Sequence, residues 1–279
     1  MLGKGTEYLR SAVRAALGKK DTGLARRVSL TRFVDAAHDL EPEWPKLDKV
    51  KRGDRFGEAA NVELKAAGVP EVGTVVKPLP GRTLGQFDFV PWDLDLDDAA
   101  FDEPTIDRES MSGMAETVFH ESRHAEQWFR MAQVQAGQGK TAPELVGEMG
   151  IPQAVADSAV QAKLSGEGQD VEEGKAWQAS VYGADAAHRQ QVYADLDAHS
   201  TALDEKAVAY DTARSKLDAV QADPHRTQES LEAATKAVGE AWAAYQEACK
   251  TLKASYEKYR ALPEEADAWA VGERTKGAY

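Results

Sequence analysis

The sequence is poor in cysteine and in long apolar runs, and both absences exclude classes of protein. Its single cysteine, Cys249, excludes an intramolecular disulfide. No apolar run approaches the roughly 20 residues that a membrane-spanning helix needs. Residues 1–17 also lack the continuous apolar core of a Sec signal peptide. The sequence therefore predicts a protein without a transmembrane segment that is either cytoplasmic or exported without a Sec signal peptide.

Basic residues are also scarce relative to acidic ones. The chain of 279 residues has 34 Lys and Arg against 47 Asp and Glu, which gives a net charge of −13. Binding to nucleic acid requires clustered cations at the phosphates, so this balance argues against a nucleic-acid partner. A hydrophobic content of 42% is typical of a globular protein, and the length suffices for one large or two small domains.

Local patterns predict a mainly α fold with a small β-sheet, an α+β protein. Residues 1–17 are predicted to form an amphipathic helix, with Tyr8, Leu9, Val13 and Leu17 on its apolar side. Strand patterns occur at residues 73–77, 86–90 and 92–96. Pro91 lacks a backbone donor, so the strand beside it should be an edge strand or bulged. We expect four regions: N-terminal helices at 1–68, an edge strand and central helix at 69–187, a helical hairpin at 188–261, and a returning helix at 262–279.

The predicted hairpin depends on two series of apolar residues spaced seven apart. The first series is Leu196, Leu203, Tyr210 and Leu217, and the second is Leu231, Val238, Tyr245, Leu252 and Tyr259. The break at Asp223 and Pro224 between them predicts two antiparallel helices, at residues 190–222 and 226–261. Such an arm could dock a protein partner or could simply stabilise the fold.

The chemistry of the chain is predicted by the run His120-Glu121-Ser122-Arg123-His124. On a helix, positions i and i+4 lie on one face, so the two imidazoles can bind one metal ion. Glu121 lies at the flank of that face, where a carboxylate can take a proton from a water on the metal. The spacing therefore predicts two metal ligands and a general base.

A metal site of this kind needs a third protein ligand, and residues 259–269 offer one. Pro263 suits the first turn of a new helix, which places Glu264 and Glu265 in that turn. Glu265, Ala268 and Trp269 then share a face, and the small Ala268 allows a close approach to a neighbouring helix. The pattern leaves both Glu264 and Glu265 open as the third ligand.

The two segments together resemble zincin metallopeptidases of the glutamate-ligand type, the gluzincins. Residues 120–127 and 259–272 resemble more closely the metallopeptidase-like domains of bacterial toxin and effector proteins. The resemblance implies a zincin-like core into which the hairpin is inserted, and a hydrolase that cleaves a protein or peptide substrate. It implies that Zn²⁺ is bound by His120, His124 and Glu265, and that Glu121 is the catalytic base. Tyr259 is the first choice for the donor to the oxyanion, ahead of Tyr256 and His188.

Two positions depart from the family pattern. Arg123 is charged where zinc peptidases usually carry an uncharged residue, so it must reach solvent or pair with Glu126, Glu264 or Asp267. Trp269 stands where such enzymes have an aspartate that holds a ligand histidine. Asp267 or a backbone carbonyl could replace that aspartate.

The same residues suggest three other interpretations. The first is a non-catalytic helical interaction or effector module in which zinc is structural. The second is a di-iron carboxylate bundle, but it needs two E-x-x-H segments, and Asp185 to His188 supplies only D-x-x-H. The third, a peptide deformylase, requires an upstream cysteine ligand, whereas Cys249 lies downstream.

Overall fold

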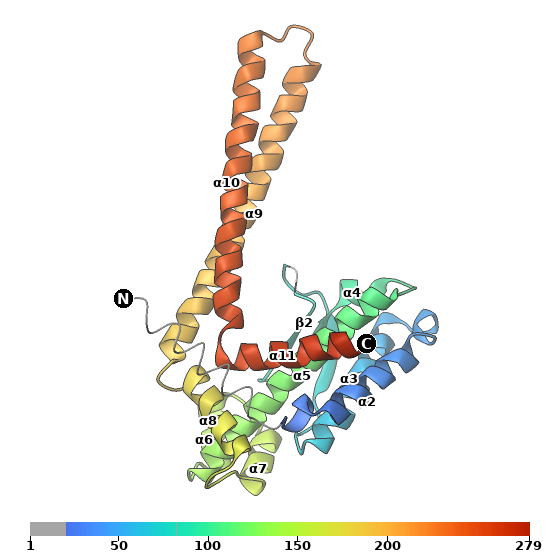
Figure 1. Ribbon diagram of the computed structural model, residues 1–279, viewed down its shortest axis with the longest axis vertical. Helices are drawn as coiled ribbons and strands as arrows, with labels where there is room; N and C mark the ends of the chain where they lie inside the picture. The colour runs from blue at the N-terminus through green and yellow to red at the C-terminus, as the bar shows by residue number, and fades with distance from the viewer. Residues whose placement is uncertain (1–20, 82) are drawn as a thin grey trace. The chain divides into compact units, whose positions relative to one another are not determined.

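The computed structural model describes residues 21–81 and 83–279, which form a mainly helical fold with one small sheet (Figure 1). The amphipathic helix predicted for residues 1–17 lies outside the described residues. The elements in chain order are η1 Gly23–Ala25, α2 Arg27–Leu40, η2 Trp44–Lys46, α3 Lys49–Ala66, β1 Gly73–Lys77, β2 Gly85–Asp88, β3 Asp93–Asp97, α4 Asp98–Asp102, α5 Arg108–Gly137, α6 Ala142–Met149, α7 Gln153–Gln161, α8 Gln169–Val181, α9 Ala186–Ala222, α10 Gln228–Arg260 and α11 Pro263–Ala278. No helix among these is long and apolar enough to cross a bilayer.

The sheet has the strand order β1-β3-β2, with β3 in the centre. β1 pairs with β3 in parallel, whereas β2 pairs with β3 antiparallel across the turn that contains Pro91. Leu94 and Leu96 of β3 are almost fully buried, as the central position of this strand requires. β2 is therefore an edge strand, as the sequence predicts for the strand beside Pro91.

The central element of the core is α5, which is buried on nearly all sides. Its first turn is capped by Asp107, whose carboxylate accepts a hydrogen bond from the Ser110 backbone N–H at 2.7 Å. Phe119 of α5 stacks on Phe33 of α2 with 4.5 Å between the ring centroids. Because α5 has neighbours on several faces, the side chains of its middle turns are held in the interior of the protein.

The residues divide into two compact units, one formed by residues up to Gln178 together with Asp267–Tyr279, and the other by Ala179–Ala266. In the second unit α9 and α10 form the predicted antiparallel hairpin (Figure 1). The aromatic ring of Tyr210 lies 5.1 Å from that of Trp242 and 6.4 Å from that of Tyr245. The two heptad series thus meet across the hairpin.

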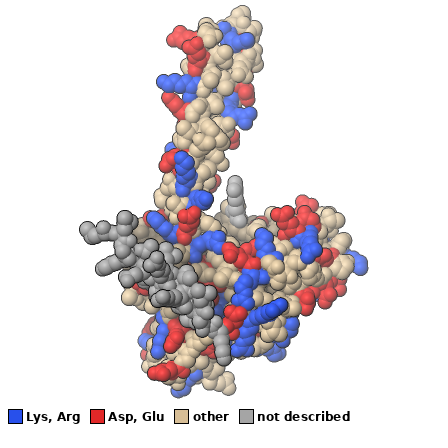
Figure 2. Space-filling view, in the orientation of Figure 1, with Lys and Arg blue, Asp and Glu red and all other residues tan. Residues whose placement is uncertain are grey.

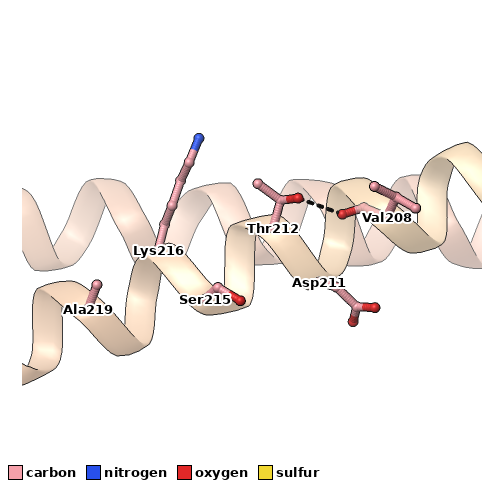
Figure 3. A pocket seen from close by; sticks show the side chains of 6 residues that line it. All are labelled: Val208, Asp211, Thr212, Ser215, Lys216 and Ala219. Atoms are coloured by element: carbon pink, nitrogen blue, oxygen red, sulfur yellow. Dashed lines mark hydrogen bonds between the residues drawn. The ribbon is translucent and has the colours of Figure 1, made fainter.

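The surface of the hairpin carries basic and acidic side chains in alternation (Figure 2). An open groove of about 510 Å³ runs along α9, and its lining residues are Val208, Asp211, Thr212, Ser215, Lys216 and Ala219 (Figure 3). The Thr212 hydroxyl donates to the Val208 carbonyl one turn earlier, so this polar group is satisfied within its own helix. The groove gathers no set of groups suited to catalysis.

Deleting the hairpin tip, residues 211–237, and joining the arms by a short turn should leave the remaining protein folded. Only Val192 of α9 and Ser255 of α10 are buried, and both lie outside the deleted segment. Thermal unfolding followed by circular dichroism should show a midpoint close to that of the intact chain.

Leu252→Asp, near the base of the hairpin, should instead lower the free energy of unfolding by about 1–3 kcal/mol because it places a charge in the helix seam. Loss of folding on tip deletion together with a harmless Leu252→Asp would contradict this account.

Candidate metal centre

The two histidines of the H-E-x-x-H run lie side by side in the middle of α5. Their Nε2 atoms are 3.2 Å apart, and the exposed fractions of His120 and His124 are 4% and 8%. Two nitrogens bound to one tetrahedral zinc ion at 2.0–2.1 Å would be separated by about 3.3 Å. The spacing of the two rings therefore fits a shared ion.

The third candidate ligand is Glu265, in the first turn of α11. His120, His124 and Glu265 each offer a ligand atom, and these atoms all lie within 4.8 Å of one another. Within residues 21–81 and 83–279 no other group of three His, Cys, Asp or Glu side chains is arranged to hold an ion. Two histidines and a glutamate are a donor set of catalytic zinc sites, which leave one coordination position open. A di-iron site needs more carboxylates than this set contains.

The helix α11 reaches α5 closely because small residues line the facing side. Ala268 is fully buried, and a Cβ added at Gly272 would lie 3.2 Å from the His120 Cβ. The ring of Trp269 packs edge-on against His120, with 4.6 Å between the centroids. Trp269 thus supports His120 by packing and cannot take the place of a carboxylate that accepts a hydrogen bond.

Arg123 pairs with two of the three acids that the sequence offered. Its Nε donates to Asp267 Oδ2 at 2.7 Å and its Nη1 to Glu126 Oε2 at 2.6 Å, and the residue is 1% exposed. Burial alone would lower the pKa of Arg123, but the charges of Asp267 and Glu126 raise it above the ordinary value. Arg123 is therefore a permanent buried cation between α5 and α11.

Asp267 does not hold a ligand histidine directly, which was one of the alternatives for this position. It accepts a hydrogen bond from Gln127 Nε2 at 2.8 Å, and Gln127 Oε1 lies 2.8 Å from His124 Nδ1. Burial would raise the pKa of Asp267, but the Arg123 charge and hydrogen bonds from Arg123 and Gln127 lower it below the usual value. The carboxylate is thus linked to His124 through the Gln127 amide.

The predicted base, Glu121, lies between the first histidine and the edge strand. Its Oε2 accepts a hydrogen bond from the Phe87 backbone N–H of β2 at 2.9 Å. Its Oε1 is 3.8 Å from His120 Nε2. One carboxylate oxygen is therefore fixed by the strand, while the other is directed toward the ligand nitrogens.

The structure distinguishes the two glutamates of α11 by their partners. Glu264 forms an ion pair with Arg189 at 2.6 Å and accepts a hydrogen bond from the Ser180 hydroxyl at 2.6 Å. Glu265 accepts a hydrogen bond from the Tyr193 hydroxyl at 2.8 Å and belongs to the candidate ligand set. The arrangement favours Glu265 over Glu264 as the ligand.

Tyr193 is a residue of the site that the sequence did not indicate. Burial, followed by the charge of Glu265, raises the pKa of Tyr193 above its ordinary value, so its hydroxyl stays a donor. The predicted Tyr259 packs edge-on against Tyr193 with 5.4 Å between ring centroids, and Tyr256 lies 5.8 Å from Tyr259. The role of Tyr259 as oxyanion donor stays a prediction. No local pattern marks Tyr193, because it lies 72 residues before Glu265.

Replacing Glu264 and Glu265 separately should distinguish a structural ion-pair partner from a metal ligand. Glu265→Gln should lower zinc affinity by at least tenfold, since an uncharged amide is a poor zinc ligand. Glu264→Gln should leave zinc affinity within a few-fold of wild type and should instead lower stability, because Arg189 loses its anionic partner. Competition with a zinc-binding dye measures the affinity, and urea unfolding measures the stability. A larger loss of zinc affinity in Glu264→Gln would reverse the assignment.

The chain was compared with protein-family models, with curated proteins and with solved structures, and no match was found in any of the three comparisons.

Proposed function

We propose that this chain is a zinc-dependent peptidase whose metal is held by His120, His124 and Glu265. The observation that carries the proposal is the convergence of three ligand atoms within 4.8 Å, with the Glu121 carboxylate beside them. The resemblance of residues 120–127 and 259–272 to metallopeptidase-like domains supports the same reaction. A zinc ion in this position would supply Lewis acidity toward water and toward the carbonyl of a substrate.

Residues of the chain would supply the proton transfer, the positioning of the ligands and the stabilisation of the oxyanion. Glu121 would accept the proton of the attacking water and deliver it to the leaving amine, which is the ordinary role of a general base placed beside the ligands. The Phe87 N–H would hold one oxygen of that carboxylate, so that the other keeps its direction during proton transfer. Tyr193 would orient Glu265, and Tyr259 is the candidate donor to the oxyanion.

A peptide is the proposed substrate class because the site adjoins an edge strand. β2 pairs with β3 on one side only, and the Phe87 N–H on its outer side points to Glu121. An extended peptide can add to such an edge through backbone hydrogen bonds, which would bring its carbonyls past the base. The family resemblance implies the same arrangement.

The proposal is tested by metal-dependent cleavage of a peptide library. Zinc-loaded protein should produce defined cleavage products by mass spectrometry, a chelator should abolish them, and added zinc should restore them. His124→Ala should give no products under the same conditions, because one ligand is missing. Cleavage that persists at full rate in the chelated protein or in His124→Ala would exclude a zinc peptidase with this site.

A second function, docking of a protein partner by the hairpin, is favoured by its exposed apolar side chains. Val208 is 66% exposed and Trp242 is 42% exposed, so the hairpin presents apolar side chains to solvent. If replacing Val208 and Trp242 by serine keeps zinc and peptidase activity but removes a biological activity, this docking function gains support. If zinc is bound in a closed site without peptidase activity, the chain is better described as an interaction module with structural zinc.

A further inference from the structure

Gln127 joins the ligand His124 to a buried ion pair, and we propose that it is a positioning residue for the metal centre. It would hold His124 in the tautomer that carries its proton on Nδ1, so that the Nε2 lone pair faces the metal. This inference rests on the proposed function, because it concerns the same three-ligand site. It also gives a reason for Arg123, the charged residue that departs from the pattern of zinc peptidases.

The orientation of the Gln127 amide follows from its neighbour on α11. Asp267 is paired with Arg123 through two hydrogen bonds, at 2.7 and 3.2 Å, so its carboxylate can only accept. The Gln127 group 2.8 Å from Asp267 Oδ2 must therefore be the amide NH₂. A flipped amide would place its carbonyl oxygen against the carboxylate, which is repulsive. Arg123 thus determines the orientation of Gln127 through Asp267.

The tautomer of His124 follows from the orientation of the amide. With its NH₂ directed to Asp267, Gln127 presents Oε1 to His124 Nδ1 at 2.8 Å. An amide oxygen only accepts, so Nδ1 must carry the proton and donate it. In a neutral imidazole the other nitrogen, Nε2, then carries the lone pair, and it is the atom 3.2 Å from His120 Nε2.

At the end of this hydrogen-bond network that lies away from His124, the Arg123–Glu126 pair is also held in place. Glu126 accepts from Arg123 Nη1 at 2.6 Å and from the Leu24 backbone N–H at 2.9 Å. Arg123 also lies over the ring of Trp177, 5.3 Å from its centroid. Arg123, Glu126 and Gln127 are each at most 1% exposed. Solvent therefore does not compete for these groups, and each fixes the donor or acceptor role of the next.

The direct test reads the tautomer of His124 in metal-free protein by two-bond ¹⁵N–¹H correlation NMR, with the His124→Ala spectrum used for assignment. We expect the Nδ1–H tautomer in wild type. Gln127→Leu should lose it in favour of Nε2–H or a mixture, because no acceptor then faces Nδ1. Asp267→Asn, at a partly exposed position, should also give a mixture because the amide is then free to flip. This second variant keeps the test decisive if Gln127→Leu folds poorly.

Zinc affinity gives an independent readout of the same role. Gln127→Leu should lower it by about 10- to 100-fold, the usual effect of losing a partner of a ligand histidine. Gln133→Leu is the matched control, because Gln133 is also buried on α5 but binds the Ala162 carbonyl and Arg130. Any of three results would overturn the proposal. The first is an Nε2–H tautomer in wild type, and the second is an unchanged tautomer in both Gln127→Leu and Asp267→Asn. The third is a loss of zinc affinity in Gln133→Leu equal to that in Gln127→Leu. The tautomer is read without metal, so this result is distinguishable from a failure to find peptidase activity.

Discussion

Glu121→Gln should lower the rate of peptide hydrolysis by about 10² to 10⁴ or more, because the amide cannot accept the proton of the attacking water. The variant should retain zinc, since Glu121 is not one of the three candidate ligands. It should also keep the fold, because the change is nearly isosteric. The measurements are the initial rate on a cleaved library peptide and the zinc content of the purified variant.

Glu116→Gln is the matched control for this prediction. Glu116 lies on the same helix and pairs with Lys276 at 3.0 Å, so the substitution removes the same charge away from the ligand nitrogens. Its hydrolysis rate should stay within a few-fold of wild type. If Glu121→Gln hydrolyses the peptide as fast as Glu116→Gln does, Glu121 is not the base and the proposed reaction is wrong.

Arg123→Leu should lower the free energy of unfolding by about 3–5 kcal/mol, because breaking a buried ion pair leaves unpaired charge in the interior. The substitution deprives Glu126, 1% exposed, and Asp267 of the guanidinium between them. It also removes the cation from the face of Trp177. Urea unfolding of the metal-free protein measures this loss without a contribution from metal binding.

Arg274→Leu provides the comparison for the buried arginine. Arg274 also binds a carboxylate, that of Asp21, with two nitrogens, but both side chains are about half exposed. Such a pair contributes at most about 1 kcal/mol, so its loss should shift unfolding little. Adding Glu126→Gln and Asp267→Asn to Arg123→Leu should recover part of the lost stability. Equal destabilisation by Arg123→Leu and Arg274→Leu would contradict a structural role for the buried network.

The elements of this fold were predictable to the extent that their patterns are local. The heptad spacing predicted the hairpin because both arms bury the same seam, where Tyr210 meets Tyr245. The alternating runs predicted the strands, with β2 and β3 shifted by about one residue. The parallel pairing of β1 with β3 was not predictable, because a period of two residues says nothing about which strands become neighbours.

The contacts of the candidate site were likewise predictable where the partners are close in sequence and not where they are distant. The i and i+4 spacing brings the Nε2 atoms of His120 and His124 together, and the same helical rule could have indicated Gln127, three residues after His124. A buried arginine needs an acidic partner, and the sequence therefore indicated three candidate acids for Arg123. Two of these candidates, Glu126 and Asp267, bind it. Tyr193 was missed because its contact with Glu265 depends on tertiary packing.

The most direct test of the central claim is a crystal structure of zinc-soaked protein with anomalous diffraction measured above and below the zinc absorption edge. The account predicts one strong peak per chain that appears only above the edge, within about 2.0–2.2 Å of His120 Nε2, His124 Nε2 and a carboxylate oxygen of Glu265. The same measurement on His120→Ala should show no peak there. A wild-type crystal with no peak between these three side chains, or with zinc held by other residues, would contradict the account.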